Sequence, residues 1–92
     1  MNEFQTKAIN AARTVLFNEL GYYNTNKIAL DDMYVVWFCK TLQNWKAMVS
    51  GVHIKEYIEV TYNGDKGETY VDVYCKACNQ CLKDGGDEIA DK

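Results

Sequence analysis

The N-terminal part of the chain carries apolar residues at the spacing of one face of an α-helix. They recur every three or four positions, at Phe4, Ala8, Ala11 or Ala12, Val15, Leu16 and Leu20. Asn2 can cap the start of such a helix, with Gln5 three positions later, and Gly21 can supply the left-handed residue that ends it. The pattern predicts an amphipathic helix whose apolar stripe packs on the rest of the domain.

The run from Met33 to Leu42 is aromatic and β-branched and is the most strand-like part of the chain. It has almost no charge, which is typical of a central strand that is buried on both faces. The pair Asp31-Asp32 just before it suits a turn. A polar pair at 43–44 can return the chain into a second strand over 45–50, and a helix over 42–49 is the alternative.

Strict alternation of apolar and polar residues follows over 57–62 and again over 68–75, with a turn containing two glycines between them. This pattern predicts a β-hairpin. Its inward residues are expected to be Ile58, Val60, Val71 and Val73. The elements add up to an α+β fold in which an N-terminal helix packs on an antiparallel meander of three or four strands. We expect one domain over residues 1–83 and an acidic flexible tail over 84–92, which has two glycines and four acids.

Length and composition narrow the class of protein. With 92 residues, 48% of them hydrophobic, the chain can form one domain with a modest core. The net charge of −3 comes from the residues after 83, so the rest is near neutral and has no basic stripe to neutralise phosphates. We therefore expect no direct nucleic-acid partner. No apolar run is long enough to span a bilayer and no signal peptide is evident, so we expect a cytoplasmic protein.

Four cysteines in so short a chain indicate metal binding in a reducing compartment. Cys75, Cys78 and Cys81 are three residues apart, and overlapping Cys-x-x-Cys pairs let a short segment curl around one ion. With Cys39 as fourth ligand, the sequence predicts a closed, structural Zn²⁺ site that forms a C-terminal clasp on the domain. His53 is the alternative fourth ligand. An iron–sulfur cluster and cysteines without a metal are the other interpretations.

A resemblance rests on two blocks of the sequence, YVVWFCKTLQNWKAMVSG at 34–51 and YIEVTYNGDKGETYVDVY at 57–74. They resemble a family of short proteins of unknown function that are encoded by phages and prophages of Gram-positive bacteria. Small, acidic, zinc-containing phage proteins of this size include inhibitors of CRISPR effector nucleases. The resemblance therefore implies an inhibitor that acts in the bacterial host cytoplasm, most specifically on a type II CRISPR nuclease. It carries over no catalytic residue.

No arrangement typical of an enzyme is evident, because the single histidine has no nucleophile pattern around it and no glycine-rich phosphate loop precedes a helix. We expect a protein that binds a bacterial defence protein directly through exposed aromatic and acidic side chains, which supply contact area and complement a basic target. The predicted contact residues are Tyr22, Tyr23, Tyr70, Asp72 and Tyr74. The alternative is a phage accessory or regulatory protein that acts through protein–protein contacts, for example as a homodimer formed through an exposed sheet edge.

Overall fold

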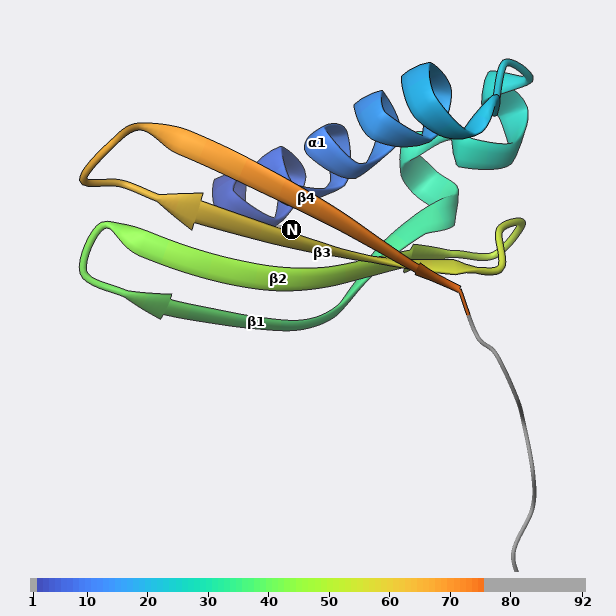
Figure 1. Ribbon diagram of the computed structural model, residues 1–92. Coiled ribbons are helices and arrows are strands. Elements are labelled where there is room, and N and C mark those ends of the chain that lie inside the picture. The colour runs from blue at the N-terminus through green and yellow to red at the C-terminus, as the bar shows by residue number, and fades with distance from the viewer. Residues whose placement is uncertain (1, 76–92) are drawn as a thin grey trace, which may run out of the picture.

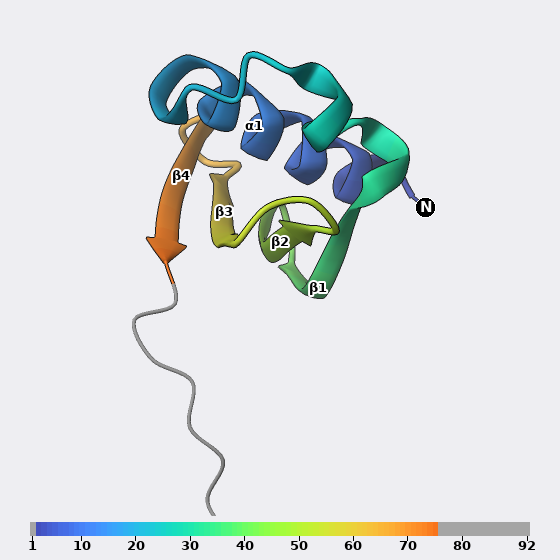
Figure 2. The same cartoon turned by 90° about the vertical axis from the view of Figure 1, so that its right-hand side faces the viewer.

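A computed structural model describes residues 2–75, in which one helix packs on one face of a four-stranded antiparallel sheet (Figure 1). Two layers result, with the helix above the sheet and all four strands in a row beneath it (Figure 2). The elements in chain order are α1 (Glu3–Leu20), the 3₁₀ turns η1 (Thr25–Ile28) and η2 (Leu30–Asp32), and the strands β1 (Met33–Thr41), β2 (Asn44–Gly51), β3 (Glu56–Asn63) and β4 (Glu68–Cys75). The predicted α+β class and antiparallel meander are confirmed. The predicted acidic tail over 84–92 lies outside the described residues.

Helix α1 has both of the predicted ends. The side chain of Asn2 accepts a hydrogen bond from the backbone N–H of Gln5 at 2.8 Å, which satisfies one of the free donors of the first turn. Gly21 has φ 76°, the left-handed conformation that glycine adopts without steric cost. The stripe that faces the sheet is fully buried at Ala8, Ile9, Ala12 and Leu16.

Each strand pairs with the next one in the chain, in the order β1-β2-β3-β4. The register places Ala47 of β2 beside Val60 of β3, which in turn lies beside Val71 of β4. Because side chains alternate between the two faces of a sheet, this row and the rows two residues away all point toward α1. We call this side the covered face. Its centre is the core of the protein, with Ala47, Val49, Ile58 and Val60 completely buried.

The prediction that Met33–Leu42 forms a central strand buried on both faces is wrong. Strand β1 is an edge strand, since it pairs with β2 alone, and Met33 is its only buried residue. The register shifts between Val35 and Trp37, where a bulge breaks the alternation of side chains. As a result Val35 and Phe38 pack on the core, whereas Trp37 points to the other side and is 41% exposed. Apolar residues on both sides of β1 therefore do not mean that both sides of this strand are covered. The pair Asp31-Asp32 lies in η2 rather than in a simple turn.

The β1–β2 and β3–β4 turns meet at one end of the sheet. The backbone N–H of Gly64 donates a hydrogen bond to Asn44 Oδ1 at 2.8 Å, and the side chain of Gln43 donates one to Asp65. A Cβ atom at Gly64 would lie 2.3 Å from the carbonyl oxygen of Gln43, a distance that real Cβ atoms essentially never show. Glycine at position 64 thus lets the two turns touch. The β2–β3 turn and the end of β4 lie at the opposite end of the sheet (Figure 1).

Candidate functional site

The face of the sheet that points away from α1 is the candidate interaction surface. We call it the open face, because no helix or strand within residues 2–75 covers it (Figure 2). Its residues follow from the register. Tyr57 lies beside Tyr74, and Thr61 lies beside Tyr70. The central row runs across all four strands and consists of Trp37, Met48, Glu59 and Asp72.

Aromatic side chains dominate the exposed part of the open face. Tyr34, Tyr70 and Tyr74 are each about half exposed, at 46%, 51% and 50%. Trp37 stands between Tyr34 and the β1–β2 turn, and Tyr57 is partly exposed on β3. Isolated exposed hydrophobic residues are ordinary, but several large aromatic residues gathered on one sheet face are characteristic of an interaction site.

Acidic residues outnumber basic ones on the open face. Strand alternation places three carboxylates there, Glu59, Glu68 and Asp72, against Lys46 of β2. A second lysine, Lys55, precedes β3 and lies beside Tyr34 and Tyr57 at the border of the face. The Nζ atom of Lys46 lies 3.8 Å from Glu59 Oε2, so this lysine neutralises one of the three. The β4 side of the face therefore carries an excess of negative charge.

These carboxylates change the acidity of the neighbouring tyrosines. The hydroxyl of Tyr70 donates a hydrogen bond to Glu68, and this bond raises the pKa of Tyr70 above its usual value. The pKa of Tyr74 is raised chiefly by the charge of Glu59, which lies diagonally across the β3–β4 pair. Both phenols are therefore neutral hydrogen-bond donors at physiological pH.

The five predicted contact residues fall into two groups. Tyr70, Asp72 and Tyr74 lie together on the open face, as strand alternation indicated. Tyr22 and Tyr23 lie after the end of α1, on the other side of the sheet. The aromatic residues of β1 and β3 that complete the open face, Tyr34, Trp37 and Tyr57, were not among the predicted contacts. Tyr57 could have been identified from the sequence, because it lies two residues before Glu59 and so shares its side of the strand. For Tyr34 and Trp37 the bulge breaks the alternation of β1, so their common side could not be read from the sequence.

Tyr22 has a structural role in the fold. Its hydroxyl donates a hydrogen bond of 2.6 Å to Oε1 of Glu56, a carboxylate whose residue is only 4% exposed. Partial burial, together with this bond, raises the pKa of Tyr22 to about 12. Tyr23 is 68% exposed and packs edge-on against Phe17, with ring centroids 5.3 Å apart. Neither residue contributes to the open face.

Two of the four predicted zinc ligands lie in the described part of the chain, and the fold separates them. Cys39 is on β1 and is level with Tyr70 of β4, whereas Cys75 is the last residue of β4. Three strand spacings and five residues along the sheet put these cysteines on the order of 20 Å apart. Thiolates that share one Zn²⁺ lie within about 4 Å of each other, given Zn–S bonds of about 2.3 Å. Cys78 and Cys81 lie outside the described residues.

His53, the alternative fourth ligand, lies in the β2–β3 turn, at the same end of the sheet as Cys75. Its Nε2 atom is 3.4 Å from Oδ2 of Asp32. Within residues 2–75 no three histidine, cysteine or acidic side chains gather as a metal site would require. Of the two candidate fourth ligands, His53 lies at the end of the sheet where β4 ends at Cys75, and Cys39 lies toward the opposite end.

Over residues 2–75 the structure has no helix that is long and apolar enough to cross a membrane.

Comparisons with known proteins identify the family. The chain matches neither a curated protein nor a solved structure. Residues 5–84 match the model of a family of unknown function, DUF6275, over a longer stretch than the two blocks at 34–51 and 57–74. The chain therefore belongs to the DUF6275 family.

Proposed function

We propose that this protein is a binding module whose open face docks on a basic surface of another protein. The observation that carries the proposal is the combination of exposed tyrosines with uncompensated carboxylates on one uncovered sheet face. Tyrosine and tryptophan provide a large contact area at a small cost in conformational entropy, and they are enriched at protein interfaces. Carboxylates at the rim steer a positively charged partner and exclude an acidic one.

Charge complementarity favours a protein partner over a nucleic acid. The phosphate backbone requires lysines and arginines, and among the described strand residues of the open face only Lys46 is basic. It is already paired with Glu59. A nucleic-acid-binding groove on another protein, by contrast, is rich in lysine and arginine and would accept this surface.

The specific partner we propose is a type II CRISPR effector nuclease of a bacterial host, which a phage-encoded copy of this protein would inhibit by direct binding. The support is the resemblance to short phage proteins, the absence of a recognisable catalytic motif in the sequence, and an acidic, tyrosine-rich face. The guide–target channel of such nucleases is positively charged. A domain that occupied part of this channel would block DNA without any chemistry of its own.

The direct test mixes the purified full chain with a guide-loaded type II nuclease and measures DNA cleavage and co-elution. Stoichiometric inhibition is expected for the wild type. The double variant Glu68→Lys/Asp72→Lys should lose it at physiological salt, while the control Tyr23→Ala, on the other side of the sheet, should inhibit normally. Inhibition unaffected by the double variant would remove the open face from the proposal. No inhibition of nucleases from several hosts would remove the nuclease as partner.

A second candidate function is self-association at a sheet edge. Strands β1 and β4 each pair on one side only within the described residues, and unpaired edges can add a strand from a second copy. Sedimentation equilibrium distinguishes this function. A dimer that is disrupted by a proline in edge strand β1 or β4 in a variant that still folds, but not by side-chain changes on the open face, would support an accessory protein acting as a homodimer.

The structural Zn²⁺ site is proposed with a changed ligand set, Cys75, Cys78, Cys81 and His53, because Cys39 lies at the far end of the sheet. The metal would hold the C-terminal segment at this end and would contribute directly to folding stability. Native mass spectrometry should find one zinc per chain in wild type and in Cys39→Ser, and a loss of zinc in His53→Ala. Retention in His53→Ala with loss in Cys39→Ser would restore the original set.

A further inference from the structure

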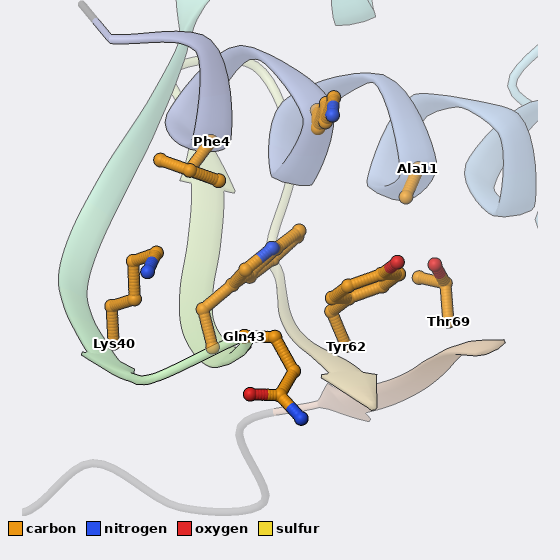
Figure 3. A pocket seen from close by; sticks show the side chains of 8 residues that line it. Phe4, Ala11, Lys40, Gln43, Tyr62 and Thr69 are labelled. Carbon is orange, nitrogen blue, oxygen red and sulfur yellow. The ribbon is translucent and has the colours of Figure 1, made fainter. Parts of the chain in front are cut away.

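A cavity of about 450 Å³ lies between the first half of α1 and the covered face, on the other side of the sheet from the proposed docking surface. Helix residues Phe4 and Ala11 form its roof, and Tyr62 and Thr69 of β3 and β4 lie opposite them (Figure 3). Its size falls within the range of about 300 to 1,000 Å³ that is usual for small-molecule sites. The cavity exists because Ala11 leaves the space above Tyr62 unfilled, where a longer side chain would reach the sheet.

Flat aromatic rings form the floor of this cavity. Trp45 stacks with Tyr62 at a centroid distance of 5.6 Å and an interplanar angle of 21°. Trp45 also lies against Phe38, with centroids 5.9 Å apart, and Phe38 lies against Phe4 of the roof. An aromatic ring in the cavity would therefore lie next to the rings of Phe4, Trp45 and Tyr62, and pairs of aromatic rings attract each other in offset-stacked or edge-to-face contacts.

The charged groups around the cavity are both cationic. Lys40 Nζ lies 5.3 Å from the centroid of the Phe4 ring, and Lys7 Nζ lies 6.0 Å from the same centroid. Lys40 donates one hydrogen bond to the carbonyl of Leu42, which leaves two of its three donors free. Lys7 pairs with Glu3 at 4.0 Å, and this exposed pair is weak. Among the described residues that line the cavity none is acidic.

From this arrangement we propose that the cavity binds a small planar aromatic anion, with its ring between Phe4 and the Trp45–Tyr62 stack and its acidic group on Lys7 and Lys40. Thr69 stands at the border of the cavity and offers a hydroxyl to a further polar group of the ligand (Figure 3). The ligand class is an aromatic carboxylate, sulfonate or phosphate. A neutral aromatic molecule would make no use of the positive charge of the two ammonium groups, and an inorganic anion would make no contact with the aromatic floor.

The test uses 8-anilinonaphthalene-1-sulfonate as the probe, in the full-length chain with Trp37→Phe. This background removes the tryptophan of the open face, so quenching of the remaining tryptophan reports on Trp45 in the cavity floor. We expect saturable binding with one site per chain. The neutral analogue N-phenyl-1-naphthylamine should bind at least five-fold more weakly.

Two variants and one control decide the outcome. Ala11→Leu fills the cavity and should weaken binding at least ten-fold, and Lys7→Gln/Lys40→Gln should do the same for the anionic probe while leaving the neutral analogue unchanged. The control Lys46→Gln, on the open face, should bind as tightly as the parent. Thermal denaturation shows whether each variant is folded. If Ala11→Leu fails to fold, the double lysine variant decides alone, since Lys7 is largely exposed. Equal affinity for the neutral analogue, or affinity unchanged in the double variant, would overturn the proposal.

Discussion

The two faces of the sheet are built from the same strands but have opposite properties. On β3, Ile58 and Val60 point to α1 and are completely buried, whereas Glu59 and Thr61, which alternate with them, point to the open face. The covered face holds most of the apolar area that folding removes from water. The open face holds tyrosines and carboxylates that the described part of the chain leaves in contact with solvent. We infer that one face determines stability and the other determines what the protein binds.

Polar side chains on the two faces of the sheet also differ in whether the fold gives them a hydrogen-bond partner. The buried polar pair on the helix side, Tyr22 and Glu56, is satisfied by its own hydrogen bond, and among described residues no buried side-chain polar atom lacks a partner. On the open face, Asp72 has no hydrogen bond or ion pair within the described residues. Polar groups on the covered side thus serve the fold, and those on the open side are available to another molecule.

The largest expected effect is the difference in unfolding free energy between a substitution on the covered face and one on the open face. Ile58→Ala should lower the free energy of unfolding by about 2 to 5 kcal/mol, because it removes three buried carbons and leaves a cavity in the core. Met48→Ala, in the centre of the open face, should cost less than about 1 kcal/mol. Urea denaturation of both variants measures the difference. A cost at Met48 as large as that at Ile58 would mean that the open face is covered in solution.

A smaller difference is expected between two tyrosine hydroxyls. Tyr22→Phe removes the donor to the buried carboxylate of Glu56 and should cost about 1 to 3 kcal/mol. Tyr74→Phe removes a hydroxyl on the open face and should leave stability nearly unchanged. Thermal denaturation at pH 7 gives both values. Equal effects would contradict the division of roles between the faces.

The pH dependence of stability should show the same division. The pKa of Tyr22 is about 12 in the folded protein, against an ordinary value of about 10, so folding favours the protonated phenol. The stability that it contributes is fully present below pH 10 and is lost as the pH rises through 12. Denaturation midpoints measured between pH 9 and 12 should fall less steeply in Tyr22→Phe than in wild type. Tyr74→Phe, whose phenol pKa is raised by Glu59 at the surface, should change the slope less.

The smallest effect is expected for the ion pair of the open face. Lys46→Gln removes the partner of Glu59 and should destabilise the protein by less than about 1 kcal/mol, because the lysine is 46% exposed and solvent screens the pair. The difference from wild type should disappear in 1 M NaCl. Binding to a basic partner should strengthen in this variant, since the face gains net negative charge. Weaker binding would place Lys46 itself in the contact.

Features set by neighbouring residues could be predicted from the sequence. The caps of α1 depend on Asn2 and Gly21, and the β3–β4 hairpin depends on alternation around one turn. The same alternation was enough to place Tyr70, Asp72 and Tyr74 on a common face. Each of these predictions uses interactions within about ten residues of the chain, where propensity and spacing are informative.

Features set by distant contacts could not be predicted. Whether Met33–Thr41 is a central or an edge strand depends on what pairs with it, and the bulge near Trp37 reverses the parity of its apolar residues. The sequence near Tyr22 gives no sign of its structural role, because its hydrogen-bond partner, Glu56, comes 34 residues later. The separation of Cys39 from Cys75 likewise follows from strand order, which spacing in the sequence does not contain.

The meander topology also has a consequence for how the protein folds during synthesis. Every strand pairs with its neighbour in the chain, so the sheet can form by local steps, and topologies of this kind fold quickly. Helix α1 is the exception, since it leaves the ribosome before the four strands and its apolar stripe packs on the sheet that they form. At about 5 to 20 residues per second, translation keeps that stripe without its sheet for on the order of seconds. In this interval the newly made helix is the part of the chain most in need of protection from aggregation.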